Sequence, residues 1–262
     1  MQAFCGNAFR FLGNMVDFVP NTPQTLLDAG ANVGFASLLF APFLRYSGRI
    51  LAVDASPSTH EVLQRNMGPF AATVDTVWGA IVPDAQARRG GTVRFGGAAG
   101  EHWGNQVQAD AAQPLETAYD VPTVSLPQLA VRLSTVTPWQ RGVRGAAIVS
   151  AWGRHAARGR GRRRCARVQA RMPSKRFDFI KLDIEGAETG VLADEPSRAV
   201  LCKATCLFME LHERMVPGSR AAFDDFLRSG CGGKARFAHA IQTGEYIAVC
   251  DKHVIERGPA DA

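Results

Sequence analysis

The sequence predicts an α/β protein with a doubly wound, mostly parallel sheet. Three observations lead to this fold class. Short apolar runs alternate with segments of helical periodicity through the first third of the chain. The same alternation resumes at "FDFIKLDIEGAE", and two further apolar runs flank a turn at Gly244 near the end. Alternation of this kind predicts parallel strands joined by right-handed crossovers, with the ligand across their carboxyl ends.

The first third reads strand, helix, strand, helix, strand. The second helix has Ser56 as N-cap, Pro57 at its first position and Gly68 at its stop. The predicted strands are Thr25–Ala29, Arg49–Asp54 and Val74–Val82, and the first predicted helix is Val33–Tyr46.

Later elements follow the same logic. We expect a short strand at Thr92–Phe95, a strand and helix start within Val121–Leu129, strands at Phe177–Asp183 and Thr205–Leu211, a helix beginning near Gly186, a helix at Ser219–Ser229, and a terminal strand pair at Ala235–Ala240 and Glu245–Cys250.

The basic character of the chain belongs to one segment. The formal net charge is +6, yet residues 141–176 hold twelve Arg and Lys and no acid, which leaves 18 basic and 24 acidic residues elsewhere. We expect residues 134–175, rich in Arg and Gly, to be a disordered insertion. We expect a single domain over residues 1–262, which includes this insertion, with residues 1–22 as a helical lead-in.

The composition also limits which binding partners and which cellular compartment we expect. Nucleic acid is not expected as a partner, except through the 141–176 segment, and only Trp152 within it and Trp139 just before it are present for stacking. No apolar run approaches the roughly 20 residues of a membrane span. The six cysteines form no C-x-x-C pair, so we expect reduced, buried thiols in a reducing compartment such as the cytoplasm. Oligomeric state is not indicated.

A glycine loop follows the first strand in "LLDAGANVG", residues 26–34. Glycines at 30 and 34 permit tight turns and close approach of a ligand. Asp28 at the strand end would repel a pyrophosphate and attract a cationic group. The amino-acid end of S-adenosylmethionine carries an ammonium and a sulfonium, so this donor suits the loop. The alternative for Asp28 is a carboxylate that stabilises the loop.

Asp54 closes the second strand, 24 residues after Gly30. An acid at this place can accept hydrogen bonds from both ribose hydroxyls. Dinucleotide-binding folds use the same device, so the acid before the glycine loop is what favours an adenosyl donor. The alternative for Asp54 is an N-cap of the following helix.

These motifs, with "FDFIKLDIEGAETGVL" and "FMELHE", resemble the FkbM family of methyltransferases. The strand ending in Lys-x-Asp-x-Glu-Gly-x-Glu is the most specific of them. The resemblance runs from Thr25 to Cys250, apart from the Arg-rich segment. It implies a Rossmann-like class I methyltransferase fold with seven strands, S-adenosylmethionine as donor and a hydroxyl acceptor.

The resemblance also assigns residues. The donor loop falls on Asp28, Gly30, Asn32 and Gly34, with Asp54 in the ribose place, where the family more often has Glu. The signature motif places Asp183, Glu185 and Glu188, and the later acid is Glu210.

Four residues are candidates for catalysis: Asp183, Glu185, Glu210 and His212. They follow neighbouring strands and should converge on one rim, where a carboxylate or His can take a proton from a hydroxyl. The alternative for His212 is a solvated histidine at a strand end. The alternative for Glu188 is a residue that complements a helix dipole. A divalent metal at this rim is a minority alternative, and we expect none. His102 and Trp103 either cover a ligand or anchor their loop.

The leading function is therefore methyl transfer from S-adenosylmethionine to the hydroxyl of a small molecule, sugar or lipid-like acceptor. Two alternatives remain. One is a nucleotide-cofactor oxidoreductase, although the G-x-G-x-x-G loop is missing. The other is a non-catalytic polyanion-binding protein that acts through the Arg-rich segment.

Overall fold

The computed structural model describes residues 24–41, 48–71, 73–96, 106–107, 118–135 and 176–253. The predicted lead-in, residues 136–175 of the predicted insertion, and the loop with His102 and Trp103 lie outside these ranges. Cys5 and Cys165 lie outside them as well.

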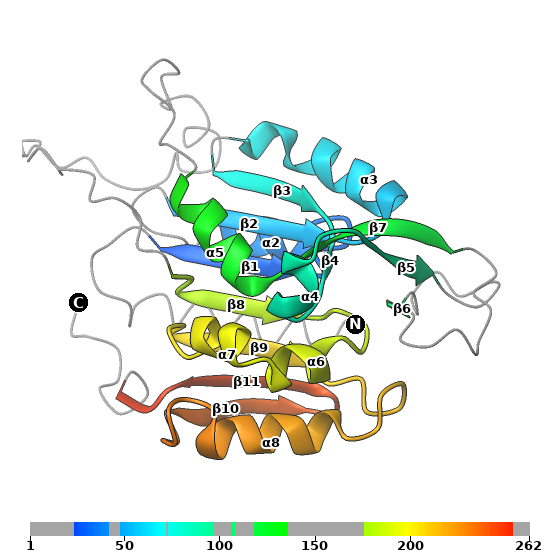
Figure 1. The fold of residues 1–262 in the computed structure, drawn as a ribbon. Helices are drawn as coiled ribbons and strands as arrows, with labels where there is room; N and C mark the ends of the chain where they lie inside the picture. The colour runs from blue at the N-terminus through cyan, green and yellow to red at the C-terminus, as the bar shows by residue number, and fades with distance from the viewer. Residues whose placement is uncertain are drawn as a thin grey trace, which may run out of the picture.

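A seven-stranded sheet forms the centre of the fold, in the order β10-β11-β9-β8-β1-β2-β3 (Figure 1). Strands β3, β2, β1, β8 and β9 are mutually parallel, and β11 is antiparallel to both β9 and β10. The bounds are β1 Thr25–Ala29, β2 Arg49–Asp54, β3 Val74–Trp78, β8 Phe179–Leu182, β9 Cys206–Glu210, β10 Phe237–Thr243 and β11 Tyr246–Asp251. This confirms the predicted mostly parallel sheet with a C-terminal antiparallel pair.

Helices cover both faces of the sheet because its strands are apolar on both sides. Leu27 and Leu51 point to the larger core cluster, together with residues of α5, α6, α7 and α8. Leu26 and Ile50 point to the opposite cluster, with residues of α2 and α3. The helices are α2 Phe35–Phe40, α3 Pro57–Met67, α4 Asp84–Arg88, α5 Leu126–Thr135, α6 Glu188–Ala193, α7 Glu195–Leu201 and α8 Ser219–Ser229. No helix in the described ranges is long and apolar enough to cross a membrane.

A second, four-stranded sheet was not predicted. Its order is β4-β7-β5-β6, with β4 Ala80–Ile81, β5 Thr92–Gly96, β6 Gln106–Val107 and β7 Tyr119–Val124. The predicted strand Val74–Val82 divides at Gly79, because the residues after it pair with β7 rather than β2. Figure 1 shows this sheet beside the carboxyl ends of the main strands.

The expectation of reduced cysteines is wrong for four of the six. Disulfides join Cys202 to Cys231 and Cys206 to Cys250. Cys206 and Cys250 are opposite each other on the paired strands β9 and β11, so the antiparallel register brings them together. The sequence preference for a reducing compartment rested on reduced thiols and loses that basis.

These two bonds should be measurable on the purified chain. Peptide mapping without reductant should recover both cross-linked pairs. Each bond closes a loop of a few tens of residues, so reduction should lower the free energy of unfolding by about 2–4 kcal/mol per bond. A Cys202→Ser/Cys231→Ser double variant should keep the Cys206–Cys250 bond. Complete alkylation of all four positions in the native, unreduced chain would contradict the pairing.

Candidate functional site

The glycine loop lies against the end of β8. Gly30 has φ 72°, and a Cβ built there would stand 1.6 Å from the backbone oxygen of Asp183. Gly34 has φ 93°, and a Cβ there would meet the side chains of Met67 and Leu63 at 2.6 and 2.8 Å. Both positions therefore need glycine, for conformation and for space.

Asp54 fastens this loop to the end of β2. One carboxylate oxygen accepts the N–H of Asn32 at 2.8 Å, and the other accepts the N–H of Ser56 at 2.9 Å. Burial raises the pKa of Asp54 to about 6, although both backbone bonds oppose the rise. Ser56, not Asp54, is the N-cap of α3, since its side chain accepts the N–H of Thr59. The acid predicted for ribose thus adjoins the glycine loop.

Asp28 differs from its predicted role. Its side chain is 0% exposed, and one oxygen accepts the hydroxyl of Ser37 at 2.6 Å. The other oxygen has no hydrogen bond and lies 3.6 Å from the ammonium of Lys181. The carboxylate therefore does not face a ligand directly. The alternative interpretation, a loop-stabilising acid, describes these contacts.

Lys181 joins the two halves of the site. Its ammonium donates to the carbonyl of Gly30 at 3.0 Å and lies 3.1 Å from Asp183. Burial alone would lower its pKa, yet the charges of Asp183 and Asp28 hold that pKa above its usual range. Sequence reasoning gave Lys181 no role. The sequence signal that could have identified Lys181 is its place in the Lys-x-Asp motif.

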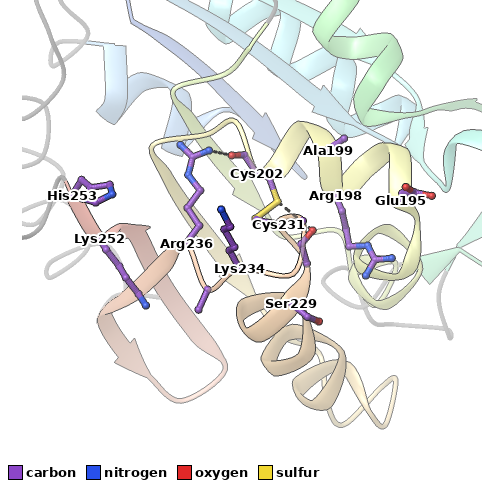
Figure 2. Close-up of a pocket in the computed structure, with 13 residues that line it drawn as sticks. Glu195, Arg198, Ala199, Cys202, Ser229, Cys231, Lys234, Arg236, Lys252 and His253 are labelled. Carbon is purple, nitrogen blue, oxygen red and sulfur yellow. Dashed lines mark hydrogen bonds between the residues drawn. A yellow bond between two sulfur atoms is a disulfide. The ribbon is translucent and has the colours of Figure 1, made fainter.

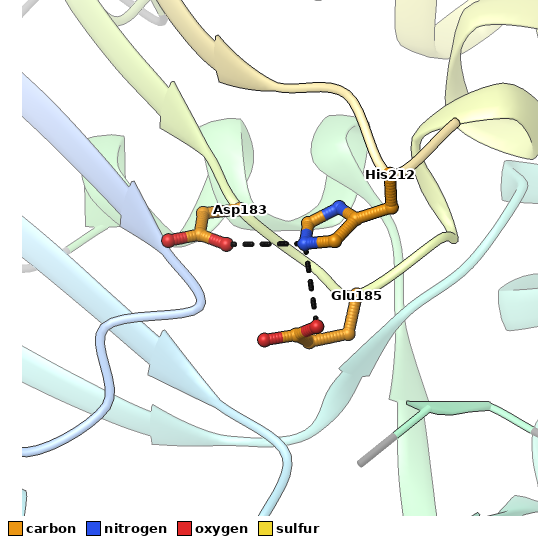
Figure 3. Close-up of side chains that lie close together, drawn as sticks. All are labelled: Asp183, Glu185 and His212. Atoms are coloured by element: carbon orange, nitrogen blue, oxygen red, sulfur yellow. Dashed lines mark ion pairs between the residues drawn. The ribbon is translucent and has the colours of Figure 1, made fainter. Parts of the chain in front are cut away.

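The four candidate catalytic residues come together at the carboxyl edge. Asp183 and Glu185 follow β8, whereas Glu210 ends β9 and His212 lies just beyond it. The imidazole Nε2 of His212 lies 3.3 Å from Glu185 and 3.8 Å from Asp183 (Figure 3). The prediction that these side chains converge is confirmed.

His212 is not the solvated histidine of the alternative interpretation, because its side chain is only 7% exposed. Its Nδ1 lies 3.1 Å from the buried carboxylate of Glu188. Burial would lower the pKa of His212, but hydrogen bonds to Glu185 and Glu188 raise it to about 11. The imidazole is therefore protonated at neutral pH.

Glu188 holds the turn before α6. Its carboxylate accepts the N–H of Ile184 at 2.8 Å and that of Gly186 at 2.9 Å, in addition to its contact with His212. These bonds satisfy two backbone donors of the turn that precedes α6. Glu188 therefore positions His212 and the turn, and does more than complement a helix dipole.

Glu210 and Tyr246 face each other across β9 and β11. Burial, followed by the negative charge of Asp183, raises the pKa of Glu210 to about 7. A hydrogen bond with Tyr246 opposes that rise. For Asp183, burial would raise the pKa, but the charge of Lys181 holds it below its usual value. Two neighbouring carboxylates thus differ in proton affinity, as an acid–base site requires.

Two aromatic residues that the sequence did not single out lie near Asp54. Trp78 is paired with Asp54 in the register of β2 and β3, is 40% exposed, and donates its indole N–H to the carbonyl of Ala55 at 3.0 Å. Tyr119 on β7 hydrogen-bonds Ser56. An exposed indole beside an acid offers a surface for a purine and a partner for its ribose.

Asp183, Glu185 and His212 also form a potential metal-binding group, since one ligand atom from each lies within 4.8 Å of the others. A metal ligand needs a neutral Nε2, whereas the surrounding carboxylates favour the imidazolium. The imidazolium already balances part of the negative charge. The same geometry therefore supports either a cation or an ion-paired histidine.

The family model described as methyltransferase FkbM domain matches residues 163–232, the span that holds β8, β9 and the acidic cluster. This match confirms the resemblance to the FkbM methyltransferases. A comparison with curated proteins finds no match.

Three solved structures are similar in fold. An FkbM methyltransferase from Methylobacillus flagellatus KT is 12% identical, with 88% of this chain and 44% of that chain covered and a TM-score of 0.44. An O-methyltransferase from Bacillus cereus in complex with SAH is 12% identical, with 94% and 81% covered and a TM-score of 0.43. A Klebsiella pneumoniae structure with a provisional O-methyltransferase assignment is 13% identical, with 94% and 80% covered and a TM-score of 0.46.

The ion pairs of His212 predict how stability changes with pH. The folded pKa of His212 lies above its unfolded value, so this stabilisation is complete below about pH 6.5 and is lost as pH rises towards 11. His212→Gln should therefore cost more free energy of unfolding at about pH 6 than at about pH 10, measured by urea denaturation.

His60→Gln is the matched control. Burial lowers the pKa of His60, so its contribution should change with pH in the opposite direction. A pH-independent effect of His212→Gln would show that His212 is not held as an imidazolium.

Proposed function

We propose, from the premise that this chain is an FkbM-family methyltransferase, that it methylates a hydroxyl oxygen of a small acceptor with Glu210 as general base. S-adenosylmethionine is the donor that the family assignment supports. The observation that carries the proposal is Glu210 itself, a carboxylate with a pKa of about 7 at the rim shared with the donor loop.

The residues around the loop fit an adenosyl group. Asp54 has its carboxylate at the end of β2 and keeps 9% exposure, which suits contact with ribose hydroxyls. Trp78 offers an exposed ring one strand away. Gly30 and Gly34 leave the backbone open to close approach. We assign these residues, with Asn32, to the donor.

The electrostatics favour a cationic donor, although Asp28 is not the group in contact. Within the described ranges, two cations lie among five carboxylates, those of Asp28, Asp183, Glu185, Glu188 and Glu210. Those cations are Lys181 and His212. The excess of negative charge at this partly buried edge attracts a sulfonium. The attraction is stronger than between the same charges in bulk water, because the local dielectric constant is lower. When bound, the donor supplies an electrophilic methyl group on that sulfonium.

The chain's own residues then manage the acceptor proton. Glu210 takes the proton that the acceptor hydroxyl loses as its oxygen gains the methyl group. A base with a pKa near the working pH is best matched to this task. Asp183 stays ionised beside Lys181, keeps the pKa of Glu210 raised, and orients the acceptor. His212, held by Glu188 and Glu185, fixes the positions of the acids.

The proposed base bears on the class of acceptor. A carboxylate base near neutrality suits a hydroxyl, so we propose a small molecule, sugar or lipid-like acceptor. The oxidoreductase alternative would bind NADH, and the polyanion-binding alternative would act without methyl transfer. A tritiated-methyl transfer screen over a cell extract identifies the acceptor and separates the proposal from both alternatives, and calorimetry with NADH separates the two alternatives from each other.

Donor binding should depend on Asp54. Asp54→Asn removes the charge from two hydrogen bonds to the ribose, so affinity for S-adenosylhomocysteine should fall about 10- to 100-fold by calorimetry. Asp75→Asn is the control, since Asp75 lies on β3 and pairs with Arg132. Circular dichroism should show both variants folded. Unchanged affinity in Asp54→Asn would remove Asp54 from the donor site.

Catalysis should depend on Glu210 and on its tyrosine partner. The rate should rise with pH through about 7 as Glu210 loses its proton. Glu210→Gln should lower kcat about 100- to 10,000-fold with little change in donor affinity. Tyr246→Phe removes a hydrogen bond that lowers the pKa of Glu210, so the rising limb should move to higher pH.

Glu245→Gln serves as the matched control, because Glu245 adjoins Tyr246 but pairs with Arg214. Its pH–rate profile should match that of the unmodified chain. A Glu210→Gln variant that keeps more than about a tenth of the activity would exclude Glu210 as the base.

A further inference from the structure

A cavity lies at the opposite edge of the sheet, where β9 and β10 begin and β11 ends. Its volume is about 770 Å³, within the range of small-molecule sites. Figure 2 shows its walls, which come from α7, the turn after α8, and the start and end of the terminal strand pair. The lining residues are Glu195, Arg198, Ala199, Cys202, Ser229, Gly230, Cys231, Gly232, Lys234, Ala235, Arg236, Lys252 and His253.

The walls of this cavity are fixed to one another. The Cys202–Cys231 disulfide joins the end of α7 to the turn after α8. Arg236 donates to the carbonyls of Cys202 and Ala204, and its guanidinium lies 2.9 Å from Asp251. Three segments distant in sequence therefore meet through a covalent bond and a partly exposed ion pair. These contacts hold the walls of the cavity in place at this edge of the sheet.

The lining carries an excess of positive charge. Arg198, Lys234, Arg236 and Lys252 face a single carboxylate, that of Glu195. Asp251 compensates Arg236. Within the described ranges, Arg198, Lys234 and Lys252 have no carboxylate at ion-pair distance. Among the described residues, the lining also includes no Phe, Tyr, Trp or branched aliphatic side chain. A multiply charged anion would therefore find three cations that form no ion pair within the described ranges.

We propose that this cavity binds an oligophosphate, a ligand carrying two or three linked phosphate groups. Guanidinium and ammonium groups together are the usual partners of phosphate oxygens. A single phosphate would use only part of the volume and of the charge. The cavity lies at the amino ends of the parallel strands, away from Glu210 and the donor loop, so this proposal does not depend on the proposed function.

Calorimetric titration of the full chain with tripolyphosphate tests the proposal. One equivalent should bind, about tenfold or more tightly than inorganic phosphate, and affinity should fall as salt rises. Arg198→Glu, Lys234→Glu and Lys252→Glu should each weaken binding about fivefold or more. Lys203→Glu makes the same charge change on the exposed residue after Cys202, outside the lining, and should weaken binding less than about twofold.

Two further measurements keep the result interpretable. Affinity for S-adenosylhomocysteine should be unchanged in all four variants, and Lys234→Gln/Lys252→Gln gives a milder test if a charge reversal fails to fold. A single-stranded RNA dodecamer that displaces tripolyphosphate would identify a polymer as the source of the phosphates, and one that does not would identify a free oligophosphate. Absence of tripolyphosphate binding at low salt, or equal weakening by Lys203→Glu, would overturn the proposal.

Discussion

One buried lysine holds the functional edge together. Lys181 lies between the carboxylates of Asp28 and Asp183 and donates to the carbonyl of Gly30. Two acids from neighbouring strands would repel each other in a buried site without this cation. Gly30 approaches the backbone of Asp183 closely at the same point. The ammonium of Lys181 thus contacts both the glycine loop and the acidic cluster.

This arrangement separates acids that hold the structure from acids that can act. Asp28 and Glu188 are fully buried, and their oxygens are directed at Lys181, Ser37, His212 and backbone N–H groups. Asp183, Glu185 and Glu210 remain partly open at the rim. The buried acids fix two cations, and those cations fix the positions and proton affinities of the open acids. We therefore propose that the rim as a whole, and not Asp28 alone, attracts a positively charged donor.

Much of the fold could be predicted because its signals are local. Strand runs, the N-cap at Ser56 and the stop at Gly68 are short-range patterns, and they gave the main sheet and the convergence of the acids. The remaining features depend on contacts between distant segments. Cys206 meets Cys250 only through the register of β9 and β11, and Trp78 reaches Asp54 only through that of β2 and β3. The motif located Lys181, but not the direction of its side chain or the burial of Asp28.

The most direct test is the affinity of Lys181→Met for S-adenosylhomocysteine, with Lys203→Met as the matched control. Loss of the shared cation leaves Asp28 buried without compensation, so the free energy of unfolding should fall by about 3–5 kcal/mol. At a temperature where the variant is still folded, its affinity should fall more than about tenfold, whereas Lys203→Met should bind normally. A folded Lys181→Met variant that binds S-adenosylhomocysteine as tightly as the unmodified chain would contradict the account.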